Sequence, residues 1–306
     1  MASLRHIRRR IRSIQSTQQI MRAMQLVSAS KFKRAHGRLL QGRQVLEFLD
    51  GLLQRVLAAV PDLQHPLSVR RDEVPSALVV VTSDTGLAGS YNTNLIQLAE
   101  AELRRESAQQ TQLSYIGKRG HRYFTKRGYA AKDAYLDLAG RPDIMRIDTI
   151  GQTLMEQFLA GEIGSVRLLY AQFVSPSVSR PTVQQWLPIM LNAGAADDRA
   201  RVPGGAGRAK EVPRAERRAA PAEYIFEPSP QRVFEDLLPR WAIATFRLIM
   251  LEAFTSEHGA RMIAMKNATD NAQEILEDLT MQRNKIRQAS ITKELSEIVG
   301  TVEALR

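Results

Sequence analysis

The 306-residue sequence contains no cysteine. This absence excludes disulfide bonds, thiolate metal sites and cysteine nucleophiles. Long apolar runs are also missing: the strongest, at residues 77–82 and 244–254, are too short or too interrupted to cross a bilayer, so we expect no membrane-spanning helix. A third absence is local, because the first 43 residues hold 11 Arg or Lys and no Asp or Glu.

The positive charge of the chain lies almost wholly in that N-terminal stretch. Residues 44–228 contain 22 basic and 21 acidic residues, and residues 229–306 contain 10 and 11, so residues 1–43 account for the net charge of +11. Close positive charges on one helix repel each other, which favours an acidic partner: a phosphate backbone, an anionic lipid or a carboxylate-rich protein surface. The alternatives are a solvated helix face and a cleaved, Arg-rich transit peptide.

Both ends of the chain show helical periodicity. Residues 3–58 contain no proline, and a second stretch runs from Ser229 and Pro230, which are typical of a helix start, to the C-terminus with only Pro239 early on. Two such helices predict an antiparallel two-stranded coiled coil of residues 1–60 and 229–306, with the C-terminal helix extending beyond its partner. Apolar residues at spacings of four and three form the stripes: Ile7, Ile11, Ile14, Met21, Phe32, Ala35 and Leu39, then Ile291, Leu295, Ile298, Val302 and Leu305.

Strand and helix patterns alternate in the middle of the chain. Strands are predicted at 76–84, 111–118, 165–175 and 182–190, and helices at 90–107, 120–128 and 149–161. This alternation predicts a Rossmann-like α/β domain over residues 75–192 with a largely parallel sheet. The Ala-, Gly- and Pro-rich residues 193–222 predict a flexible insertion before the last helix.

Motifs for chemistry are weak. The loop TSDTGLAGSYN (Thr82 to Asn92) lies where main-chain N–H groups can hold a phosphate, but it lacks the GxGxxG and GxxxxGK[ST] spacings. We therefore expect a tight strand-to-helix turn there, with nucleotide binding at Gly86 to Gly89 as the alternative. The five histidines are scattered, and each is expected at the surface rather than on a metal. The residues predict no catalytic site, cofactor or metal.

A family resemblance is carried by the two ends of the chain, ASLRHIRRRIRSIQSTQQIMRAMQLVSASKFKRA and SEHGARMIAMKNATDNAQEILEDLTMQRNKIRQASITKELSEIVG. Both closely resemble the terminal helices of the gamma subunits of F-type ATP synthases. The loop TSDTGLAGSYN and the stretch YIFEPSP at Tyr224 are also similar to that family. The resemblance leaves out mainly residues 193–222.

The resemblance implies a non-catalytic rotor without a cofactor, present in one copy per complex. In this family the coiled coil sits inside a hexamer of alpha and beta subunits, which hold the nucleotides. The α/β domain is a foot on the membrane c ring beside epsilon. The lack of cysteine argues against the chloroplast type, so the resemblance implies a bacterial type, peripheral at the cytoplasmic face of the inner membrane. The competing interpretation is a nucleic-acid-binding protein that uses the basic helix.

The resemblance also implies three sets of contact residues. Met24, Arg8, Arg9 and Arg22 would meet the acidic lever of the beta subunits. Polar "catch" contacts with alpha and beta loops would come from Arg261, Arg287, Gln288, Thr292 and Glu294. Contacts with the c ring would come from Tyr224, Phe226 and Glu227, where Phe226 stands in place of a tyrosine often seen in the family.

Overall fold

The computed structural model describes residues 4–60, 63–71, 73–105, 111–138, 140–190 and 226–304. The chain forms two compact units, a larger one of residues 29–261 and a smaller one of residues 1–28 with 262–306. The predicted insertion at 193–222 lies outside the described residues. Within the described ranges, no helix combines the length and the apolar character that crossing a membrane requires.

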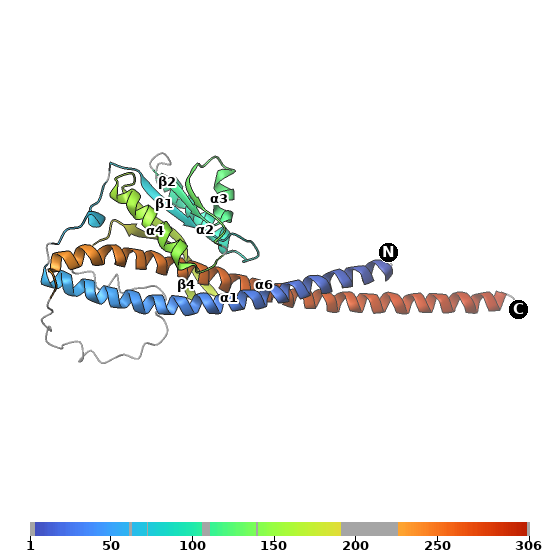
Figure 1. Ribbon diagram of the computed structural model, residues 1–306. Coiled ribbons are helices and arrows are strands. Elements are labelled where there is room, and N and C mark those ends of the chain that lie inside the picture. The colour runs from blue at the N-terminus through green and yellow to red at the C-terminus, as the bar shows by residue number, and fades with distance from the viewer. Residues whose placement is uncertain are drawn as a thin grey trace. The chain divides into compact units, whose positions relative to one another are not determined.

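A five-stranded sheet forms the middle of the larger unit (Figure 1). Its strands are ordered β3-β2-β1-β4-β5. The first four, β1 (Ser76–Val81), β2 (Thr111–Ile116), β3 (Ala131–Tyr135) and β4 (Ser165–Ser175), are parallel, and β5 (Val178–Leu187) is antiparallel to β4. The predicted α/β domain with a largely parallel sheet is confirmed.

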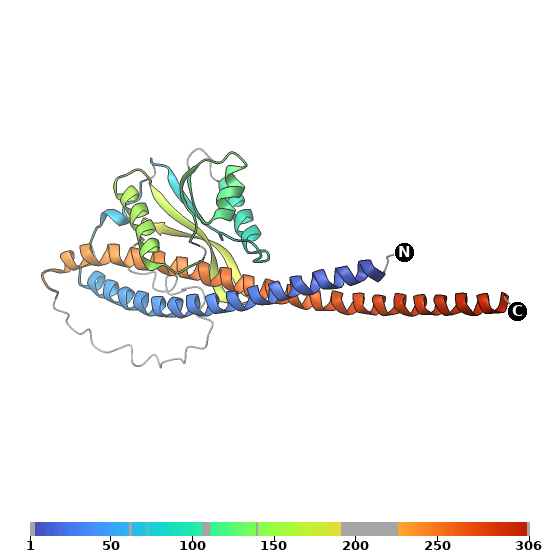
Figure 2. The same ribbon diagram turned by 45° about the vertical axis from the view of Figure 1, so that its right-hand side comes forward.

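Helices cover both faces of this sheet (Figures 1 and 2). Helices α2 (Tyr91–Arg105) and α3 (Lys118–Thr125) lie on one face, and α4 (Ile144–Leu159) lies on the other with parts of the two terminal helices. Because β1, β2 and β3 are parallel, the connections that follow them all begin at the carboxyl edge of the sheet. Ligands and functional contacts of open α/β folds usually lie at this edge.

Strand β1 is buried on both sides. Ala77, Val79 and Val81 belong to the core on the α4 side, whereas Leu78 and Val80 belong to the core on the α2 side. A strand buried on both faces needs a continuous aliphatic run instead of alternation with polar residues. This explains why the strand could be recognised in the sequence.

Strand β3 is a correction to the predicted order of elements, which has four strands. Its sequence AKDAY is only partly buried, and it pairs with β2 at the edge of the sheet. Main-chain hydrogen bonds hold such a strand more than apolar burial does, so its composition gives little signal. Helix α4 also begins earlier than predicted, at Ile144, where the Asp143 carboxylate accepts a hydrogen bond from the N–H of Arg146.

The two terminal helices are α1 (Leu4–Ala59) and α6 (Pro230–Ala304). The Ser229 hydroxyl accepts a hydrogen bond from the N–H of Arg232 (3.3 Å), as expected for the residue that caps α6. In the larger unit their inner portions pack against each other and against β4. That core contains Leu39, Leu46, Phe173, Leu248 and Leu251.

In the smaller unit the outer portions of α1 and α6 pair in antiparallel fashion. Ile7 and Ile11 pack with Leu276 and Leu279. Further along the pair, the Gln18 amide donates to the Gln273 carbonyl across the two helices (3.0 Å). Figures 1 and 2 show α6 continuing past the N-terminal end of α1, and residues 287–298 are exposed throughout. The predicted pairing and its overhang are confirmed.

Candidate functional site

The residues predicted to meet an acidic partner lie on the smaller unit's part of α1. Arg8, Arg9 and Arg22 are exposed and Met24 is half-buried. Arg8 and Arg22 are 14 positions apart, close to four helical turns, so they share one side of the helix. Arg9 and Met24 are 15 positions apart and share a second side. The set therefore forms two stripes on the helix, not one face.

Four of the five predicted catch residues lie on the overhanging part of α6. Arg287, Gln288, Thr292 and Glu294 are all exposed. Arg287 and Glu294 are seven positions apart and share one side, while Gln288 and Thr292 are four apart and share the next. The Thr292 hydroxyl donates to the Gln288 main-chain carbonyl (3.0 Å), and the three other side chains offer charges and an amide to solvent.

Arg261, the fifth predicted catch residue, has a different environment. It is only 6% exposed, within the larger unit. Its Nε donates to the Gly86 carbonyl and its Nη2 to the Thr85 carbonyl, both at 3.2 Å. Its Nη1 forms an ion pair with Glu257 (2.8 Å). The guanidinium is therefore bound within the chain.

Glu257 and His258 complete a buried polar group that the residue pattern did not predict. With Thr85, Gly86, Gly140 and Arg261 they form what we call the loop–helix cluster, which joins α6 to the connections after β1 and β3. The expectation that His258 lies at the surface is wrong, since it is 1% exposed. The Glu257–Arg261 pair at spacing i, i+4 could have predicted an ion pair on the helix, but it does not indicate burial.

The hydrogen bonds of His258 define its protonation. Its Nε2 lies 2.8 Å from the Gly140 carbonyl, and its Nδ1 lies 3.4 Å from Nη1 of Arg261. A neutral ring with its proton on Nε2 satisfies both contacts, because Nε2 then donates and Nδ1 accepts. Burial lowers the pKa of His258 to about 4 and the charge of Arg261 acts in the same direction, although the Gly140 carbonyl opposes them. Burial raises the pKa of Glu257, and Arg261 counteracts that rise.

The loop TSDTGLAGSYN makes the tight strand-to-helix turn that was expected. Leu87 and Gly89 have positive φ angles of 62° and 57°. The Ser83 N–H donates to the Asn92 side-chain oxygen (3.0 Å), which ties the start of the loop to helix α2. A cavity of about 380 Å³ lies beside the loop, and basic side chains of α3 line it, among them Arg119 and Arg122. Nucleotide binding at this loop stays an untested alternative.

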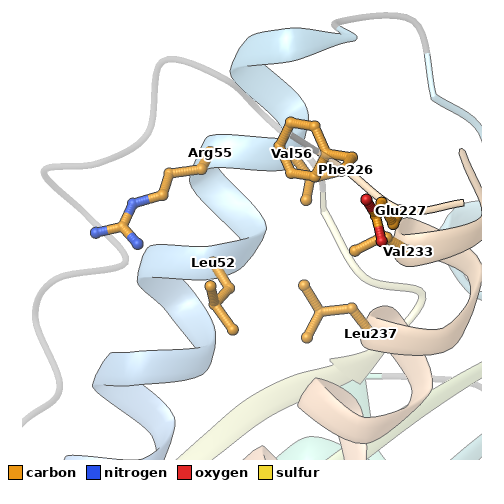
Figure 3. Close-up of a pocket in the computed structure, with 7 residues that line it drawn as sticks. All are labelled: Leu52, Arg55, Val56, Phe226, Glu227, Val233 and Leu237. Carbon is orange, nitrogen blue, oxygen red and sulfur yellow. The ribbon is translucent and has the colours of Figure 1, made fainter. Parts of the chain in front are cut away.

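The predicted c-ring contacts lie before the start of α6. Tyr224 is outside the described residues, Phe226 is partly buried, and Glu227 is exposed. Phe226 and Glu227 line a cavity of about 400 Å³ (Figure 3). The remaining lining comes from the end of α1 and the first turns of α6: Leu52, Arg55, Val56, Val233 and Leu237. Across the part of the chain that the structure describes, no group of His, Asp or Glu side chains is arranged to hold a metal ion.

An α/β domain with a largely parallel sheet, placed in the sequence between two long terminal helices that pair in antiparallel fashion, defines a helical-stalk class of protein. A family model described as ATP synthase matches residues 3–305. An ATP synthase gamma chain of Symbiobacterium thermophilum is 39% identical over 98% of this chain and 97% of its own length. Another, from Pelotomaculum thermopropionicum, is 39% identical over the whole of both chains. The chain belongs to the ATP synthase gamma chain family.

Solved structures agree with this fold. The rotor of the Euglena gracilis mitochondrial ATP synthase is similar with a TM-score of 0.63, covering 94% of this chain and 98% of that one at 16% identity. The central stalk of the Tetrahymena thermophila mitochondrial ATP synthase gives a TM-score of 0.55, covering 81% of this chain and 99% of that one at 20% identity. At these identities the similarity concerns the fold alone.

Proposed function

We propose that this chain is the central-stalk rotor subunit of a bacterial-type ATP synthase. It couples ion flow through the c ring to conformational changes of the catalytic beta subunits, and the coupling is reversible. The chain itself is non-catalytic, whereas the complete complex is a proton-transporting two-sector ATPase. One observation carries the proposal: antiparallel terminal helices, with an acid-free basic stretch on one and an exposed polar overhang on the other.

The mechanism follows from symmetry. One copy of this chain inside a ring of three alpha and three beta subunits has no threefold symmetry, so each beta subunit meets a different side of the helical pair. A contact that stabilises one conformation of a beta subunit by about 4 kcal/mol changes the ratio of its two conformations about a thousandfold. Turning the pair exchanges the three environments, and the affinity of each site for nucleotide changes in turn.

The charges suit this role. On α1, Arg8, Arg9 and Arg22 provide exposed positive charge for the acidic lever of the beta subunits, with Met24 among them. On α6, Arg287, Gln288, Thr292 and Glu294 provide hydrogen-bonding groups for the catch loops of alpha and beta. Such groups exchange water for protein partners at small net free energy, so they can form and break as the rotor turns.

The foot is proposed to contact the c ring through Tyr224, Phe226 and Glu227, with the epsilon subunit beside it. The cavity that Phe226 and Glu227 line together with apolar side chains of α1 and α6 supports this contact (Figure 3). The chain is thereby attached indirectly to the cytoplasmic face of the bacterial inner membrane. The relatives and structures named above are all ATP synthase chains, and none supports the nucleic-acid alternative.

A charge placed at Met24 tests the proposal. Met24→Lys in the assembled, membrane-reconstituted enzyme adds a positive charge beside the lever and creates an extra contact with its carboxylates. We expect ATP-driven proton pumping per ATP hydrolysed to fall at least twofold, as measured by a pH-sensitive dye alongside phosphate release.

Two variants serve as matched controls. Met24→Leu keeps the size without the charge, and Gln19→Lys adds the same charge at an exposed position outside the predicted set. Both should pump as the unmodified enzyme does. Unchanged pumping by Met24→Lys would reject the lever contact, and failure of the chain to assemble with alpha and beta subunits would reject the rotor function.

A further inference from the structure

The carboxyl edge of the sheet is bound to the chain's own helix α6. Arg261 uses three different nitrogens there: Nε for the Gly86 carbonyl, Nη2 for the Thr85 carbonyl and Nη1 for Glu257. Arginine presents its N–H groups in a planar, rigid fork, and here the fork binds two consecutive carbonyls of one loop. A lysine could not reproduce this arrangement, because its donors diverge from a single atom.

The loop that Arg261 holds contains a strained residue. Leu87 directly follows the two bound carbonyls, has a φ of 62° and is 59% exposed. Positive φ is unfavourable for a side chain such as leucine, so the loop needs contacts that fix this conformation. The Arg119 guanidinium also lies against Gly86, where an added Cβ would clash with its Nη2. Gly86 thus contacts two arginines.

Helix α6 is fixed to a second connection at the same point. His258, one turn before Arg261, bonds to the Gly140 carbonyl in the connection after β3, and Tyr91 at the start of α2 donates to the Ala253 carbonyl of α6 (3.1 Å). These bonds make residues 253–261 of α6 and the two connections one packed body within the larger unit.

The burial of Arg261 conflicts with a direct catch contact. To donate to a partner's loop it would have to release two loop carbonyls, whose hydrogen bonds are partly buried, and the buried Glu257 carboxylate. Unpaired buried polar groups are costly. The exposed arginine on the overhang, Arg287, faces no such competition.

We propose that Arg261 is a positioning residue: it fixes the connection after β1, with Leu87 at its tip, to helix α6 and makes no contact with a partner subunit. The loop then moves with α6 as one rigid part. The consequence for coupling rests on the proposed rotor function, whereas the positioning itself concerns this chain alone.

Hydrogen exchange in the isolated, full-length chain tests this directly, because no partner is present. In Arg261→Gln we expect the amides of residues 84–94 to exchange about tenfold faster, since two hydrogen bonds to the loop are lost. Arg240→Gln is the matched control: it removes the same charge from an exposed position of α6 in the same unit, and should exchange as the unmodified chain does. Urea unfolding of each variant separates a local change from a global one.

Arg261→Lys provides the second variant if the glutamine variant does not fold. It keeps a cation beside Glu257 but loses the fork, so loop exchange should rise about threefold at unchanged global stability. Unchanged loop exchange in the folded variants would overturn the proposal. So would equal acceleration throughout the larger unit, which would mark a general packing role.

Measurements in the assembled enzyme distinguish this proposal from the rotor function. Two results together support both the positioning role and the rotor function. The loop amides exchange faster in Arg261→Lys than in the unmodified chain, and the variant pumps fewer protons per ATP. If the loop loosens in the isolated chain but coupling is unaffected, the positioning stands and its assigned role in the rotor is wrong.

Discussion

Helix α6 has two opposite environments along its length. In the larger unit residues 248–259 are all buried, whereas in the smaller unit residues 287–298 are all exposed. A helix segment exposed to water is stabilised mainly by its own main-chain hydrogen bonds. A buried segment is stabilised in addition by packing contacts on every side. The first segment is therefore stabilised by this chain, and the second presents side chains for contacts outside it.

The residue types of the two segments differ less than their environments. Ile291, Leu295 and Ile298 keep an apolar stripe on the overhang although each is more than half exposed. The buried segment contains Glu252, Glu257 and His258, which on composition alone belong at a surface. An apolar stripe that no other described residue covers thus indicates a surface for other subunits, and buried charges indicate an internal attachment point.

Truncating one large side chain of α6 in each unit should show the contrast most strongly. Phe246 is fully buried, packs on Trp186 at 5.0 Å between ring centroids, and lies against Gly151. Phe246→Ala should lower the free energy of unfolding by about 3–5 kcal/mol, because it leaves a cavity. Urea unfolding followed by circular dichroism measures the loss.

Leu295→Ala is the control on the same helix. Its side chain is 57% exposed, so the free energy of unfolding should change by less than about 0.5 kcal/mol. A loss of similar size in both variants would contradict the division of α6 into a self-stabilised and a partner-facing segment.

Much of the fold could be predicted because strong local patterns met few alternatives. The aliphatic run of β1 admits only a buried strand, and the spacing of Ile7, Ile11 and Ile14 admits only a helical stripe. Strand β3 could not be predicted in this way. Its place depends on pairing with β2, which is decided by the three-dimensional arrangement.

The site was predictable only where side chains stay exposed. The resemblance indicated Arg287, Gln288, Thr292 and Glu294, and the structure leaves them open to a partner from outside. For Arg261 the same motif gives no hint of burial. Its acceptors, the carbonyls of Thr85 and Gly86, are 175 or more positions away in sequence and come close only through folding.

A change of pH should act on the buried segment through His258, since residues 287–298 contain no histidine. Its pKa of about 4 in the folded chain is below the ordinary 6.5, so the folded state favours the neutral ring. The stability from this group is fully present above pH 6.5 and is lost as the pH falls through 4. The loss approaches about 3 kcal/mol.

His258→Gln isolates this contribution, because glutamine can still donate to the Gly140 carbonyl but does not titrate. Burial raises the pKa of Glu252 and Glu257, so these groups stabilise the fold at low pH and lose that effect as the pH rises through their folded values. Both proteins contain them, so the difference between the two unfolding free energies at pH 7, 5.5 and 4 reports His258. Parallel pH profiles would exclude a neutral, buried ring.

Alanine substitutions at two glycines with positive φ angles, one beside helix α6 and one away from it, test how tightly the buried segment is held. A Cβ at Gly140 (φ 61°) would lie 2.7 Å from Nε2 of His258, whereas a Cβ at Gly128 (φ 84°) would have no other atom within 4 Å. Alanine costs backbone strain of about 1–2 kcal/mol at either site. Gly140→Ala should cost about 1–3 kcal/mol beyond Gly128→Ala, because the methyl group must displace the histidine that joins α6 to the sheet. Equal unfolding free energies for the two variants would mean that the connection after β3 yields easily, and that α6 is held less tightly at the loop–helix cluster than its burial indicates.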